Sequence, residues 1–159
     1  MLKVAKLLIV VFILTGCSDA TPIKFTKQQK VYLGIWLLHF EDITENTVRI
    51  DNMLLSIKPD GRAMFLECES SEKSSGNSKS SSSSSSKFPD AVVTQITDKT
   101  ITIVQEVAGF GFSKDLDIDK SPYLENDNWY LNIEGKKLLK VTDSSSYRKA
   151  NWDCGKKDD

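Results

Sequence analysis

The sequence contains few of the residues from which catalytic and metal sites are usually built. Its 159 residues include one histidine and three cysteines, which do not make up a zinc ligand set. No G-x-S-x-G motif is present to position a nucleophile. The formal net charge is −1, so there is no sign of the basic surface that nucleic-acid-binding proteins need. We therefore predict no catalytic residue, no metal, no cofactor, no nucleic-acid partner and no enzymatic activity.

The sequence also lacks an apolar run long enough to span a bilayer, which takes about 20 residues. Its N-terminal apolar run is shorter and covers Leu7 to Leu14. Lys3 and Lys6 precede it and two small residues follow it, which is the order of a secretory signal. We therefore assign residues 1–16 to a signal peptide. Its removal takes away two lysines and no acidic residue, so the net charge becomes −3.

The residues Leu14-Thr15-Gly16-Cys17 resemble the lipobox of bacterial lipoproteins. The resemblance implies a diacylglyceryl group on the Cys17 sulfur, cleavage just before Cys17, and acylation of the new amino group, for example with palmitate. Two or more acyl chains anchor a protein stably to a membrane surface. Because Ser18 rather than Asp follows the cysteine, the resemblance favours the outer membrane, at its periplasmic face or surface, if the bacterium is Gram-negative. The alternative is an ordinary secretory signal with a chance cysteine.

Two cysteines, Cys68 and Cys154, remain for the mature chain. An even number of cysteines in an oxidising compartment predicts a disulfide. This disulfide would fix the C-terminal tail, residues 144–159, to the body of the protein. The alternative is two separate thiols.

The part between a lipidated tether, residues 17–30, and the tail is predicted to be an all-β domain over residues 31–143. Turn signals at Pro59-Asp60-Gly61, at 97–99 and at 134–136 separate short apolar runs, as in β-hairpins. Ile101 and Ile103 alternate with threonines, the period of a half-buried strand. We expect seven or eight strands in a small antiparallel barrel or a sandwich, preceded by a short helical turn around residues 26–33.

A serine-rich tract, residues 70–87, interrupts this pattern. It contains no apolar residue, so it buries nothing that would offset the entropy of ordering it. We predict a disordered loop between two strands, produced by low-complexity expansion. The alternative is a glycosylated or adhesive loop.

Gly34-Ile35-Trp36 resembles the Gly-x-Trp of lipocalin and calycin barrels. The resemblance implies a barrel with a central cavity for a small apolar ligand, with Trp36 in the pocket. The alternative is a core tryptophan in an unrelated sheet. Residues 126–141 also resemble the closing hairpin of small bacterial lipoproteins, which implies no activity.

Two polar features have an unremarkable structural interpretation. Asp115, Asp117 and Asp119 alternate on a predicted strand and therefore point to one face. We interpret them as a solvated face, with weak cation binding as the alternative, because the glycine of a calcium loop is missing. His39, near Glu41 and Asp42, is expected at a strand end or on the surface.

Three functions are compatible with these observations. The first is a non-enzymatic, lipid-anchored envelope lipoprotein whose β-domain acts as an interaction or accessory module toward an envelope protein or a cell-wall component. The second is a lipocalin-like binder of a small apolar ligand. The third is an inhibitor of a host or rival enzyme. We favour the first.

Overall fold

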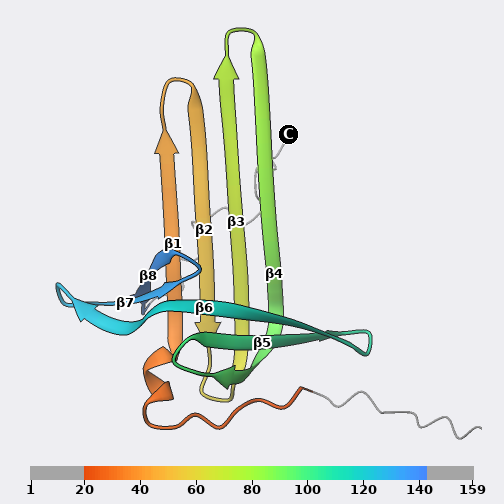
Figure 1. Cartoon of the computed structure of the whole chain (residues 1–159), viewed down its shortest axis with the longest axis vertical. Helices are drawn as coiled ribbons and strands as arrows, with labels where there is room; N and C mark the ends of the chain where they lie inside the picture. Colours follow the sequence, from red (N-terminus) through yellow and green to blue (C-terminus); the bar gives the residue numbers. More distant parts are fainter. Residues whose placement is uncertain (1–19, 143–159) are drawn as a thin grey trace, which may run out of the picture.

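The computed structural model describes residues 20–142, which form an all-β domain. One 3-10 helix, η1 (Gln29–Tyr32), precedes eight strands: β1 (Gly34–Ile43), β2 (Thr47–Ile57), β3 (Arg62–Ser75), β4 (Ser78–Ile96), β5 (Thr100–Val107), β6 (Phe110–Glu125), β7 (Asn128–Ile133) and β8 (Lys136–Val141). Each strand pairs antiparallel with the next, and β1 pairs with β8, so the sheet closes on itself (Figure 1). The predicted antiparallel barrel and the helical turn before it are confirmed.

The core lies inside the closed part of the sheet, where apolar side chains of alternate residues meet. Sixteen buried residues form one cluster, and Trp36, Phe65 and Leu131 in it have no exposed surface. The Trp36 indole nitrogen donates a hydrogen bond to the Tyr32 carbonyl at 2.7 Å, which satisfies the one polar atom of that side chain. The predicted alternation over Ile101 and Ile103 is confirmed, since both are fully buried.

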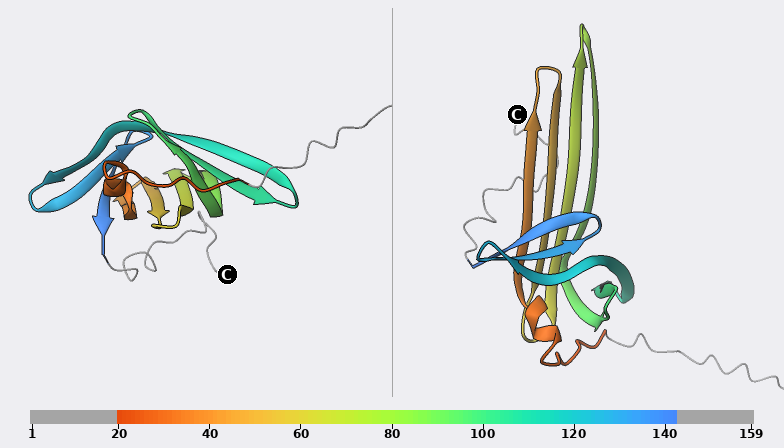
Figure 2. Two further views of the ribbon diagram at one scale, coloured as in Figure 1. Left: turned by 90° about the horizontal axis from the view of Figure 1, so that it is seen from below. Right: turned by 60° about the vertical axis from the view of Figure 1, so that its left-hand side comes forward.

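Strands β1 to β4 extend well beyond this core. The β1–β2 and β3–β4 hairpins run out to one side of the barrel, while β5 to β8 cross over their other end (Figures 1 and 2). At about 3.4 Å per residue in an antiparallel strand, the 14 residues of β3 span roughly 45 Å. We call the projecting part, residues 38–52 and 67–87, the arm.

The predicted disordered loop over residues 70–87 is an ordered hairpin in the structure. Residues of β3 from Glu67 to Lys73 pair with β2 on one side and with β4 on the other. Ser71 Oγ and Ser82 Oγ also lie 2.9 Å apart across the ladder. The prediction considered only buried apolar area, whereas the strands are held by backbone hydrogen bonds and cross-strand contacts.

The hairpin turns at the barrel end have local causes that the sequence displays. Gly61, at a φ of 84°, ends the Pro59-Asp60-Gly61 turn, a conformation that glycine adopts without strain. Three two-residue turns, at 108–109, 126–127 and 134–135, have positive φ at both residues, as in type I′ hairpins. These turns match the right-handed twist of the strands that they join.

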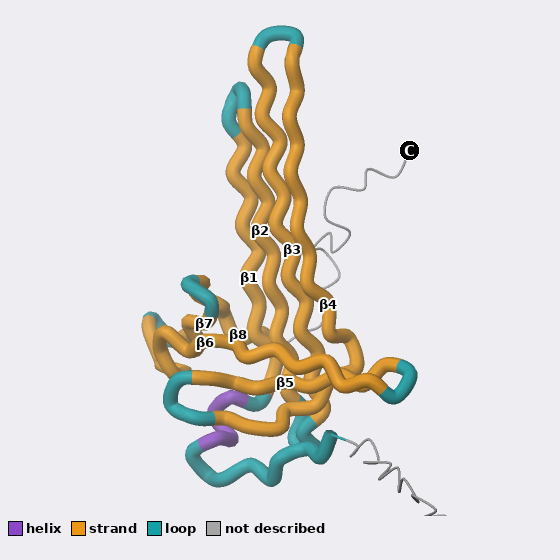
Figure 3. The backbone as a smooth tube through the Cα atoms, turned by 45° about the vertical axis from the view of Figure 1, so that its right-hand side comes forward, coloured by secondary structure: helices purple, strands orange, loops and turns teal. Residues whose placement is uncertain are grey.

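The N-terminal segment closes one end of the barrel. It runs beneath the strands from residue 20 to η1 (Figure 3), and Ile23 and Phe25 pack against the core. The Ile23 amide donates a hydrogen bond to the Val93 carbonyl at 2.9 Å. The described part of the predicted tether is therefore a packed segment, because its two apolar residues have a surface to bury.

Candidate functional site

The arm changes from apolar to polar along its length. We call the face of β1–β4 that carries Trp36 and the barrel core the inner face, and the opposite face the outer face. The strand register places Leu55, Phe65 and Phe88 in one row of the inner face. Two rows further out, the same face carries Phe40, Asp51, Glu69 and Ser84. The core therefore ends where the arm begins.

A cluster of charged side chains marks this boundary on the inner face. Lys136, the first residue of β8, places its Nζ 3.0 Å from Asp51 Oδ1, 2.9 Å from Glu67 Oε1 and 2.5 Å from Glu69 Oε1. The Lys136 and Asp51 side chains are 12% and 9% exposed. The last strand of the barrel is thus tied to both central strands of the arm. We call these four residues the Lys136 cluster.

Two further cations balance the three carboxylates. Arg49 Nη2 lies 3.8 Å from Asp51 Oδ2, and Lys114 Nζ lies 3.9 Å from Glu67 Oε2. Lys114 Nζ also stands over the Phe65 ring, 5.2 Å from its centroid, a favourable cation–π geometry. Three cations face three acids, so the cluster and its neighbours are electrically neutral.

The ionisation of the Lys136 cluster follows from these contacts. Burial by itself lowers the pKa of Lys136, but the hydrogen bonds to Glu69 and Glu67 and the ion pair with Asp51 outweigh it and raise this pKa above its ordinary value. The hydrogen bond from Lys136 lowers the pKa of Glu69. These two shifts keep Lys136 and Glu69 charged at neutral pH. A lysine held in this way is a structural counter-ion and has no proton to release to a substrate.

The outer face carries a second set of buried side chains at the base of the arm. Leu54 and Leu66 lie opposite each other there, and so do Asn52 and Cys68. All four are buried, but none of them belongs to the core cluster inside the barrel. The exposed His39 places its Nδ1 2.5 Å from Asn52 Oδ1. The predicted surface histidine His39 and the predicted disulfide cysteine Cys68 therefore lie in one row across the sheet, with Asn52 between them.

The other predicted site residues are placed as follows. Cys17 and Cys154 lie outside the described residues, so lipidation and the Cys68–Cys154 disulfide stay predictions. The interpretation of Asp115, Asp117 and Asp119 as a solvated strand face is confirmed, because all three are exposed. Within residues 20–142 no group of three or more His, Cys, Asp or Glu side chains is arranged to hold a metal ion, and no helix in this range is long and apolar enough to cross a membrane.

Trp36 is enclosed in the core, and none of three surface cavities includes it. One of these, of about 380 Å³, lies on the arm between residues 49–50, 69–71 and 82–84 and is lined mainly by serines. The second, of about 540 Å³, lies under the barrel beside Phe25 and Pro59. The third, of about 230 Å³, lies beside Met64 and Pro89. The ligand-pocket role of Trp36 has no cavity among these three to support it.

The outer edge of β1 is open along the arm. β1 pairs with β8 only from Ile35 to Leu37, so within the described part of the chain no strand pairs with that edge from Leu38 to Ile43. An open edge is a template for an added strand.

Neither the arm nor the Lys136 cluster is predicted from the sequence. A weak signal for the cluster existed, because Glu67 and Glu69 alternate on one strand and Asp51 lies at a matching position across the Pro59-Asp60-Gly61 turn. No local signal could have placed Lys136 beside them, since it is 69 positions from Glu67.

Comparison of the chain with models of protein families, with curated proteins and with solved structures finds no match in any of the three.

Proposed function

We propose that this protein is a non-enzymatic, lipid-anchored interaction module of a bacterial cell envelope, and that the arm is the part that meets its partner. The observation that carries the proposal is the placement of the arm. Its two hairpin turns lie at one end of the molecule, and the described chain begins at the other end (Figure 1). A chain anchored through Cys17 therefore holds the arm away from its membrane.

The chemistry of the arm favours a protein partner. Its β1 edge, from Leu38 to Ile43, offers backbone groups to an incoming strand. Phe40 on that strand is 45% exposed, and aromatic side chains are enriched where proteins meet. The Lys136 cluster holds the base of the arm against the barrel, so the edge is presented in a fixed direction. The proposal assigns no catalytic step and no cofactor.

The lipid anchor is tested by acyl labelling in the native host or a bacterial expression host. The wild-type chain is expected to take up labelled fatty acid, and Cys17→Ala is expected to take up none and to keep its signal segment. Normal labelling of Cys17→Ala would refute the proposed lipid anchor on Cys17. The predicted outer-membrane location is tested on the same cells by separating the two membranes.

The role of the arm is tested by site-specific crosslinking in intact envelopes. A photoreactive phenylalanine analogue replaces Phe40 on the arm and, as the control, Trp129, which is 41% exposed on the barrel. We expect a discrete protein adduct from position 40 and none of that mass from position 129. Identical adduct patterns at both positions, or no adduct at position 40, would contradict the proposal.

A further inference from the structure

The tip of the β5–β6 hairpin carries three large apolar side chains that the fold leaves uncovered. Val107, Phe110 and Phe112 are 49%, 71% and 54% exposed. Val107 pairs with Phe110 across the 108–109 turn, and Phe112 is two residues further along. Side chains of a cross-strand pair and of residues i and i+2 lie on the same face of a hairpin. The three therefore form one patch, which we call the apolar tip.

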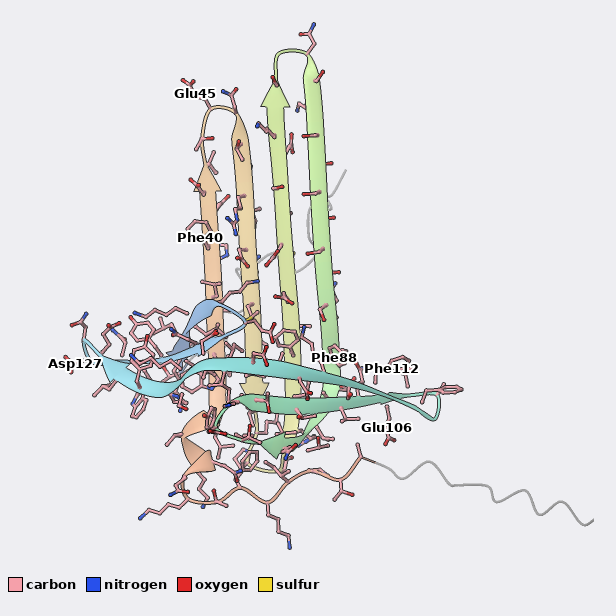
Figure 4. The ribbon with its side chains drawn as sticks, in the orientation of Figure 1. Phe40, Glu45, Phe88, Glu106, Phe112 and Asp127 are labelled. Carbon is pink, nitrogen blue, oxygen red and sulfur yellow. The ribbon has the colours of Figure 1, made fainter. Side chains whose placement is uncertain are left out.

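The apolar tip lies where the described chain begins. The Ala20 amide donates a hydrogen bond to Glu106 Oε1 at 2.5 Å, and Glu106 is the neighbour of Val107 in sequence. Figure 4 shows Glu106 near the start of the described chain and Phe112 on the other side of the same hairpin, with Glu45 at the distant end of the arm. The view from below in Figure 2 shows the same neighbourhood of the β5–β6 turn and the chain start.

The predicted acylation site is close to this patch along the chain. Cys17 precedes Ala20 by three residues, and an extended chain covers at most about 3.6 Å per residue. The Cys17 backbone is therefore within about 11 Å of the Ala20 backbone. A bilayer that holds acyl chains on Cys17 is therefore kept near Ala20, the residue that contacts Glu106.

We propose that the apolar tip inserts into the membrane surface beside the lipid anchor. The inference rests on the proposed lipidation of Cys17. Phenylalanine side chains at a bilayer surface bury their rings at the boundary between headgroups and acyl chains. The acyl chains and the apolar tip together make two points of attachment, and two points restrict the tilt of a rigid barrel. The barrel then holds the arm in a defined direction away from the membrane.

Other exposed apolar residues lie elsewhere and lack this relationship. Leu124 and Trp129 flank the β6–β7 turn, Phe40 and Ile43 are on the arm, and Val31 is in η1. Ala20, where the described chain begins, donates its hydrogen bond to the β5–β6 hairpin, so the apolar tip is the patch that the lipid anchor would bring to a membrane. A second copy of the chain is the competing occupant, and the experiment below separates the two.

The experiment uses the lipidated full-length protein, made in a bacterial host and reconstituted into phosphatidylethanolamine–phosphatidylglycerol vesicles. Three variants each add one tryptophan: Phe110→Trp and Phe112→Trp at the tip, and Phe40→Trp on the arm as the matched control. All three positions are exposed, so the core is unaltered. The added emission is the difference from the wild-type protein, and it is measured in vesicles with and without bromine on the acyl chains.

We expect brominated chains to quench at least half of the added emission of F110W and F112W and to leave that of F40W unchanged. Unquenched emission at the tip in protein that floats with the vesicles would overturn the inference and leave the lipid anchor standing. Emission at the tip that responds to protein density and not to bromine would assign the tip to a second copy and would also overturn it. Protein that does not float with the vesicles would refute the anchor, and the inference with it.

Discussion

Lys136 Nζ lies 2.9 Å from Glu67 Oε1, which joins the last strand of the barrel to the third strand of the arm across 69 positions of sequence. The same ammonium group contacts Asp51 and Glu69. Three acids converge on one largely buried lysine at the place where the apolar core ends. These ion pairs therefore hold the base of the arm to the last strand of the barrel, at a place where no apolar core connects them.

Substitution of Lys136 should lower the free energy of unfolding more than substitution of the adjacent Lys137. Lys136→Met leaves the buried Asp51 and the half-buried Glu67 without their principal counter-charge, and breaking a buried pair destabilises a protein by about 3 kcal/mol. Lys137→Met removes an exposed ion pair with Glu125 and cation–π contacts with Tyr130 and Tyr123, and such exposed contacts contribute less than a buried ion pair. Urea unfolding of both variants measures the free energies of unfolding. Equal losses in the two variants would contradict the structural role of Lys136.

The stability of the protein should depend on pH through the same contacts. The pKa of Glu69 is lowered from 4.5 in the folded state, so its stabilising contribution is present above pH 4.5 and is lost as the pH falls through the lower folded value. The pKa of Lys136 is raised from 10.5, so its contribution is present below pH 10.5 and decreases above it. We expect a stability plateau between these limits.

Unfolding titrations at a series of pH values measure this dependence. Lys136→Met should lose the part of the acid and alkaline slopes that comes from the cluster, while Lys137→Met should lose only the part that comes from the Lys137–Glu125 pair. The same slopes in wild type and Lys136→Met would assign the pH dependence to other groups.

The barrel could be predicted from sequence because its signals are local. The Pro59-Asp60-Gly61 turn and the Ile101/Ile103 alternation each depend on a few adjacent residues, and both are where the sequence places them. The closure of β1 on β8 and the contact of Lys136 with Glu67 depend on residues far apart in sequence, so no local pattern encodes them. The sequence therefore predicts the class of fold and not the junction between barrel and arm.

The arm could not be predicted because its strands bury little. Residues 78–85 of β4 are exposed, and a composition without apolar residues is typical of disorder. What orders these residues in the structure is their position at the end of a pairing network, with β3 held between β2 and β4. The serine-rich composition by itself does not indicate this strand pairing.

Hydrogen exchange tests whether the serine-rich hairpin is ordered in solution. Backbone amides of residues 70–73, which pair with β2 on one side and β4 on the other, should exchange more slowly than in an unstructured chain by a factor of about ten or more, which corresponds to roughly 1.4 kcal/mol of opening free energy. They should still exchange faster than amides of the buried β5 strand around Ile101. Exchange of the tract at unstructured rates would restore the original prediction of a disordered loop.

The predicted Cys68–Cys154 disulfide would lie on the outer face of the arm, and it can be tested by stability and mass measurements. Cys68 is 1% exposed there, opposite Asn52, and the Cα atoms of two bridged cysteines lie about 4.4–6.8 Å apart. A Cys68–Cys154 bond would therefore fix the tail of the chain against this face.

Closing so long a loop contributes roughly 4 kcal/mol in the chain-entropy description. We expect Cys154→Ser to lose about that free energy of unfolding under oxidising conditions and to match the wild type in the presence of a reductant. Intact mass of the wild-type protein without reductant should be two hydrogens lower than the reduced mass, with neither cysteine open to alkylation after denaturation. Alkylation of both cysteines in the unreduced, denatured protein would show two separate thiols and remove the tail from this face of the arm.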